Sequence, residues 1–117
     1  MSEPMSEPLL VFPNLAEEAP HIPRGIHSQT LYDGPDLRLV LFAFAPGEEL
    51  SEHTAARPAV VHVLDGEGDA IVGGQPCALS PGTWFRMPAG TPHSIHARTP
   101  LRMALYLLPD AAGPPAA

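Results

Sequence analysis

Hydrophobic and polar residues alternate with a period of two along most of this chain, and residues 37–44 show the pattern most fully. Both faces of a strand over this segment would be apolar, apart from Arg38. The two faces carry Leu37, Leu39, Leu41 and Ala43 on one side and Val40, Phe42 and Phe44 on the other. A strand that is apolar on both faces is covered on both sides. One face is therefore expected to fill a barrel interior, and the other to pack on a second layer or on another subunit.

Turn residues divide the rest of the chain into further short strands. The glycine pair Gly73-Gly74 predicts a two-residue hairpin between strands over 69–72 and 75–79. Other strands are predicted over 26–32, 59–65, 93–97 and 101–108, and a short strand of large apolar residues is predicted between Gly82 and Pro88. Short strands separated by turns every eight to twelve residues, without a convincing helix, indicate an all-β sandwich or closed barrel.

Three segments carry weaker signals. Residues 9–12 form a short apolar run that could add an edge strand. Residues 14–19 fit a single helical turn, with Asn14 as its N-cap. Residues 48–52 are acidic and are predicted to form an exposed loop.

Length and composition support one globular domain. The chain has 117 residues, of which 44% are hydrophobic, and this is enough for one core. Sixteen prolines and ten glycines favour many turns and short strands. The polar repeat at 1–8 and the alanine- and proline-rich stretch 109–117 are expected to be disordered tails, which leaves the domain at 9–108.

Charge and hydropathy exclude several classes of partner. A net charge of −7 with only six lysines and arginines argues against nucleic acid, because phosphate binding needs clustered basic residues. No apolar run approaches the roughly 20 residues of a membrane span, and no signal peptide is visible. We therefore expect a cytoplasmic protein without a membrane partner. Cys77 is the single cysteine, which excludes an internal disulfide and a cysteine-rich zinc site.

Two histidines stand at strand ends, where a barrel would open. His53 follows the acidic segment, and His93 begins a strand just after the corner made by Pro88 and Gly90. Two imidazoles can bind a transition metal, although catalytic zinc sites ordinarily have three protein ligands. His62 and His96 lie on alternating strands at positions whose side chains should point away from that opening.

The spacing of these residues resembles the two motifs of the cupin family. Pro46-Gly47, His53, the strand after it and Gly66 are similar to the first motif. Gly82, the corner Pro88-Ala89-Gly90 and His93 are similar to the second. The resemblance covers residues 46–97 and implies a cupin double-stranded β-helix, a jelly-roll-like barrel.

The resemblance also implies a metal site, of which this chain carries half. In the family, two histidines and a glutamate of the first motif join the histidine of the second around a divalent transition metal such as zinc, manganese, iron or nickel. The first and last of these ligands fall on His53 and His93. The second histidine falls on Ala55 and the glutamate on Ala59, while the asparagine that closes the second motif falls on Ala97. Because alanine has no donor atom, the metal-binding motif is incomplete.

Three hypotheses on function follow. The first is a small-molecule-binding cupin with a degenerate metal site, its pocket lined by His53, His93, Trp84 and Met87. The second is a metal-dependent enzyme of the oxygenase or isomerase type, in which solvent completes a two-histidine site. The third is a regulatory or sensor protein that acts with a partner. Trp84 and Met87 have core packing as the alternative, and the apolar strand over 37–44 favours a homodimer.

Overall fold

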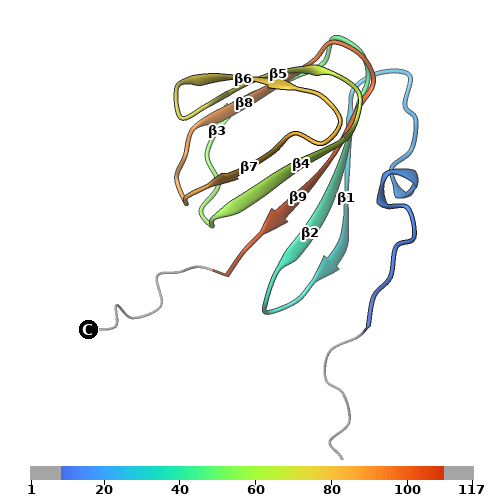
Figure 1. The fold of residues 1–117 in the computed structure, drawn as a ribbon, viewed down its shortest axis with the longest axis vertical. Coiled ribbons are helices and arrows are strands. Elements are labelled where there is room, and N and C mark those ends of the chain that lie inside the picture. Colours follow the sequence, from blue (N-terminus) through green and yellow to red (C-terminus); the bar gives the residue numbers. More distant parts are fainter. Residues whose placement is uncertain (1–8, 110–117) are drawn as a thin grey trace, which may run out of the picture.

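The computed structural model describes residues 9–109 of the chain, so both predicted tails lie almost entirely outside the described residues. This range contains one 3₁₀ turn and nine strands, and the strands form two antiparallel sheets that face each other (Figure 1). The elements are η1 (Leu15–Glu18), β1 (Ile26–Asp33), β2 (Arg38–Phe44), β3 (Glu49–His53), β4 (Ala59–Asp65), β5 (Gly68–Val72), β6 (Gln75–Leu79), β7 (Trp84–Met87), β8 (His93–Ala97) and β9 (Leu101–Leu107). The prediction of an all-β fold is confirmed.

The larger sheet has the order β1-β2-β9-β4-β7 and the smaller one the order β3-β8-β5-β6. Because side chains alternate between the two faces of a strand, one face of every strand points into the space between the two sheets. No helix in residues 9–109 is long and apolar enough to cross a membrane.

The outer face of the larger sheet is covered by the chain's own N-terminal segment, residues 9–25, which runs beside β1 in Figure 1. Leu39, Leu41 and Ala43 of β2 are buried there, as the alternation predicts, together with Ala104 of β9. Phe12, Leu15 and Ile22 of the segment pack against them. The second layer over β2 is therefore intramolecular, and its apolar outer face does not by itself require another subunit.

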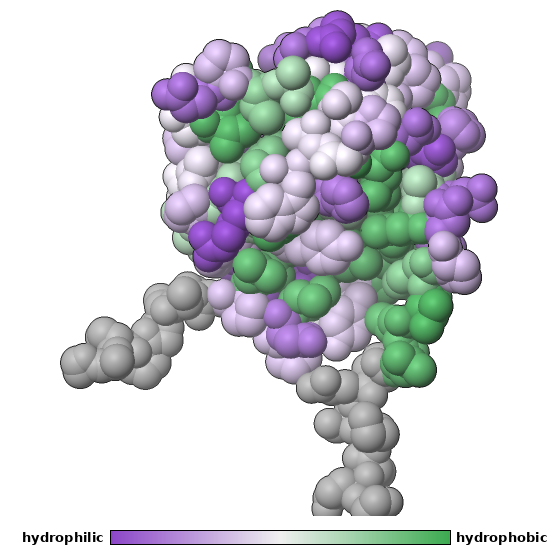
Figure 2. Space-filling model, viewed as in Figure 1, coloured by the Kyte–Doolittle hydropathy of each residue, from purple (hydrophilic) through white to green (hydrophobic). Residues whose placement is uncertain are grey.

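Arg102 of β9 fastens this segment to the sheet. Its Nη1 donates to the carbonyl oxygen of Ala16 at 2.9 Å, and its Nη2 donates to Asp65 Oδ2 at 2.8 Å. The Arg102 side chain is 15% exposed. The first three residues of the segment are less well covered: Leu9, Leu10 and Val11 are 90%, 44% and 70% exposed, and Figure 2 shows hydrophobic side chains gathered where the segment emerges.

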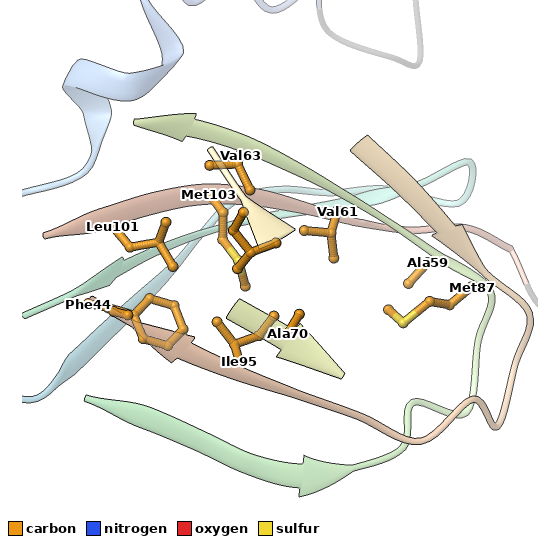
Figure 3. Close-up of a cluster of buried hydrophobic side chains, with 11 residues drawn as sticks. Phe44, Ala59, Val61, Val63, Ala70, Met87, Ile95, Leu101 and Met103 are labelled. Carbon is orange, nitrogen blue, oxygen red and sulfur yellow. The ribbon is translucent and has the colours of Figure 1, made fainter. Parts of the chain in front are cut away.

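The inner faces of both sheets meet in one hydrophobic core (Figure 3). Its buried members are Phe44, Ala59, Val61, Val63, Ala70, Leu79, Met87, Ile95, Ala97, Leu101 and Met103. Every strand except β1 and β3 contributes a buried residue to this cluster, and these two contribute the partly buried Ile26 and Leu50. The core therefore fixes the relative position of the two sheets.

Three glycines, in two turns, explain why the chain turns where it does. Gly73 and Gly74 have φ of 56° and 81°, so the predicted two-residue hairpin between β5 and β6 is confirmed. Gly66 has φ of 92°, and a Cβ placed there would collide with the carbonyl oxygen of Pro100. Only glycine can occupy position 66, because both its backbone conformation and its close neighbour exclude a side chain.

Three local predictions need correction. Residues 9–12 are not a strand: they join no ladder, and of the four only Phe12 packs against the buried cluster on the outer face of the sheet. Residues 48–52 are not a loop, because Glu49–His53 pairs with β8 as an edge strand that turns Leu50 inward. The turn at 14–19 exists as η1, but the Asn14 side chain makes no cap; its carbonyl oxygen accepts from Glu17 N at 3.1 Å instead.

Candidate functional site

His53 and His93 face each other across two paired strands. His53 is the last residue of β3 and His93 the first of β8, and the two are cross-strand partners. Their ring centroids lie 4.1 Å apart with planes inclined at 57°. His53 is exposed, whereas His93 is 7% exposed. The two imidazoles that the motif spacing singled out therefore meet in space.

The connections on either side of this pair are tied together. The amide of Gly90, in the corner between β7 and β8, donates to the carbonyl oxygen of Ala55, between β3 and β4, at 2.8 Å. Thr91 Oγ1 donates to the Pro88 carbonyl oxygen, also at 2.8 Å. The proline-glycine corner thus holds the two connections together at one end of the barrel.

Each imidazole ring is oriented by the backbone carbonyl oxygen of the residue two positions earlier in the sequence. Nδ1 of His53 lies 2.9 Å from the Ser51 oxygen, and Nδ1 of His93 lies 2.9 Å from the Thr91 oxygen. A carbonyl oxygen can only accept, so both Nδ1 atoms carry the proton and donate. In the neutral rings both Nε2 atoms then have a free lone pair.

Burial lowers the pKa of the His93 imidazole below its ordinary value of 6.5. The hydrogen bond to the Thr91 carbonyl opposes this by raising the pKa, and the neighbouring His53 lowers it further. The neutral form of His93 is therefore favoured at neutral pH.

Buried alanines stand at two positions where the family motifs carry polar side chains. Ala59, at the start of β4, pairs with Met87 on one side and with Leu107 on the other. Ala59 and Met87 are 1% and 2% exposed and belong to the inner core. Met87 is therefore a packed core residue, the alternative that the sequence left open for it. Ala97, at the far end of β8, is fully buried in the same core.

Trp84 is not brought to the histidine pair. It is 59% exposed and pairs with His62 across β7 and β4. Val61 and Phe85 on the same strands point inward, so His62 and Trp84 point outward by alternation. Trp84 is therefore part of neither the inner core nor the opening. His96, opposite Glu49, also points away from His93, as its position on the strand predicts.

The donor set does not fit the four-ligand metal centre that the motifs imply. His53 and His93 supply two imidazole donors, and Ala55 and Ala59 supply none. Among residues 9–109 no three or more histidine, cysteine, aspartate or glutamate side chains gather in a way that could hold a metal ion. The orientation of the two imidazole rings is set by the carbonyl oxygens of Ser51 and Thr91. These are backbone groups, so no pattern of side chains could have indicated this orientation.

Comparison with known proteins agrees with this geometry. The family model for the cupin domain matches residues 40–108, more than half of the chain. The chain belongs to the cupin family, and its fold is the cupin barrel. None of the curated proteins matches its sequence.

Solved structures extend the likeness to the whole fold. A cupin superfamily protein from Desulfitobacterium hafniense is 26% identical, with a TM-score of 0.76 over 92% of this chain and 94% of that one. A cupin 2 conserved barrel domain protein from Leptotrichia buccalis is 38% identical, with a TM-score of 0.74 over 81% of this chain and 46% of that one. Salicylate 1,2-dioxygenase from Pseudoaminobacter salicylatoxidans has a TM-score of 0.67 over 78% of this chain and 27% of that one, but at 21% identity it shows the fold alone.

Proposed function

We propose that this cupin binds a small molecule at the barrel end that carries His53 and His93, without a resident four-ligand metal centre. The observation that carries the proposal is the paired imidazoles, whose ring centroids lie 4.1 Å apart and whose Nε2 atoms make no hydrogen bond to another described residue. Ligand sites commonly place a few convergent polar groups at the mouth of a barrel, and the two imidazoles are such a pair.

A ligand screen by thermal shift tests the proposal, with one outward histidine as a matched control. A compound that raises the Tm of the wild-type protein should lose its effect in His53→Ala and keep it in His96→Ala, since His96 points away from the opening. At a concentration 100 times its Kd, a ligand stabilises the folded state by about 2.7 kcal/mol, which such a screen detects readily. If every active compound acts equally on wild type and His53→Ala, the site is not where we place it.

A metal-dependent enzyme is the second candidate, because both Nε2 atoms are free to act as ligands. Two histidines would hold the metal, which would act there as a Lewis acid. Elemental analysis of protein purified without an affinity tag separates the two candidates. We expect no stoichiometric transition metal; a stoichiometric metal that is lost in His53→Ala would replace the first proposal with this one.

Self-association as a homodimer is a separate proposal. It is supported by the exposed apolar residues 9–11 and by a hollow of about 260 Å³ beside them, whose lining includes Leu10, Phe12 and Tyr106. A sedimentation series over protein concentration tests it, and a monomer at every concentration would refute it.

A further inference from the structure

We infer that the site of His53 and His93 takes a small molecule that presents a hydrogen-bond donor, an O–H or N–H group, to the two imidazoles. Molecules whose polar end can only accept, carboxylates above all, should bind much more weakly. This inference rests on the proposed function and names the class of ligand that the same site would select.

The first step is the direction of the hydrogen bonds. The Ser51 and Thr91 carbonyl oxygens each lie 2.9 Å from an Nδ1 atom and fix the proton there. Neither Nε2 atom makes a hydrogen bond to another described residue. The neutral pair therefore offers two acceptors and no free donor toward the opening.

The second step is access. His53 is exposed, so its ring can be reached from solvent. The described side-chain nitrogens and oxygens that are buried without a partner are Arg38 Nε and Arg102 Nε. His93 Nε2 is not among them, although His93 is 7% exposed, so this atom also opens toward solvent. A ligand group can reach both acceptors.

The third step is charge. An anion would need a cationic or donor partner, and the nearest side chains on β3 are acidic, Glu52 beside His53 and Glu49 further along. The guanidinium of Arg57, in the adjoining connection, donates to the carbonyl oxygens of Leu108 and Leu107 at 2.7 Å and 3.3 Å. The chain as a whole carries a net charge of −7. The acidic side chains and the negative net charge disfavour an acceptor-only anion at the pair, and Nε and Nη2 of Arg57 are already engaged by backbone oxygens.

Four benzene derivatives of similar size test the inference in full-length, ¹⁵N-labelled protein. Benzyl alcohol offers an O–H donor, benzylamine N–H donors on a positively charged ammonium group, methoxybenzene an acceptor without charge, and benzoate an acceptor with negative charge. The imidazole nitrogens of His53 and His93 are followed by NMR, with His96→Ala as the variant that keeps the site. We expect both rings to carry the proton on Nδ1. Benzyl alcohol or benzylamine should shift both Nε2 signals, with an affinity roughly tenfold or more above that of benzoate and methoxybenzene, since an unpaired acceptor is costly.

Several results would overturn the inference: a proton on Nε2 of either neutral ring, equal or tighter binding of benzoate, or no response of either ring to any of the four probes. Its failure is distinguishable from failure of the proposed function. If the thermal-shift screen finds an acceptor-only compound whose effect depends on His53, the binding site stands and only the preference for a hydrogen-bond donor is refuted. If the screen finds no compound that depends on His53, the binding site itself is refuted.

Discussion

Replacing Arg102 by methionine removes the side chain that fastens the N-terminal segment to the larger sheet. Its Nη1 donates to the Ala16 carbonyl oxygen at 2.9 Å and more weakly to that of Ala19 at 3.5 Å, while Nη2 donates to Asp65 Oδ2 at 2.8 Å. Methionine keeps an unbranched apolar stem of similar length. The substitution therefore removes the charge and the hydrogen bonds while preserving most of the packing.

The expected loss of stability in Arg102→Met follows from how deeply each interacting group is buried. The short bond to the Ala16 carbonyl contributes about 2 kcal/mol, because its donor is charged and largely buried. The pair with Asp65, whose side chain is 49% exposed, contributes about 1 kcal/mol. Arg102 Nε is buried without a partner among the described residues, and removing it returns about 1 kcal/mol. The free energy of unfolding should fall by about 2 kcal/mol, which lowers the Tm of a domain of this size by roughly 8 °C or more.

Urea denaturation measures the loss, and hydrogen exchange of the amides in residues 15–22 locates it. Arg98→Met is the matched control. Arg98 also pairs with a carboxylate, Asp69, but its side chain is 47% exposed, so its loss should cost well under 1 kcal/mol. If Arg102→Met costs no more than Arg98→Met, or if residues 15–22 keep their protection, Arg102 does not anchor the segment as we reason.

Three further predictions concern the core and the site. Since burial lowers the pKa of His93 below 6.5, the unfolded chain takes up a proton more readily as the pH falls through that value. The free energy of unfolding should therefore decrease below about pH 6.5. In urea titrations at several pH values, His93→Gln should make this decrease smaller. If the variant loses as much stability as the wild type between about pH 7 and about pH 5, His93 is not the group responsible. Gly66→Ala should cost about 3 kcal/mol or more, because it combines an unfavourable φ with a collision at Pro100, and a loss below about 1 kcal/mol would show that the turn can relax. Leu101→Ala, at a side chain with no exposed surface, should cost about 2–5 kcal/mol by thermal or urea unfolding, whereas a negligible loss would mean that the core refills the space.

Much of the fold could be predicted from the alternation of side chains. The two apolar faces of β2 and the outward direction of His62 and His96 follow from the two-residue period. The same rule correctly applied would have placed Trp84 outside, opposite His62, but its hydrophobicity suggested a core or pocket role. Hydropathy describes a residue type, whereas exposure depends on which face of an edge strand it occupies.

Other features depend on contacts between distant segments, which local patterns do not encode. The acidic composition of β3 suggested a loop, but pairing with β8 makes it a strand whose glutamates face solvent. The N-terminal segment packs on β9, which lies far from it in the sequence, as well as on β2. At the site, motif spacing brought His53 and His93 together correctly, while their tautomers are set by backbone oxygens.

The order of strands in the larger sheet has a consequence for how the protein reaches its fold. The last strand, β9, lies between β2 and β4 and pairs with both. Until β9 has been synthesised, the β1–β2 hairpin and the β4–β7 pair have no backbone ladder joining them, and the N-terminal segment has no Arg102 on which to dock. Assembly of the larger sheet therefore waits for β9, although the covering segment is made before it. During synthesis the apolar faces of β2 and β4 are exposed together, which is the period when this chain is most open to aggregation and to chaperones.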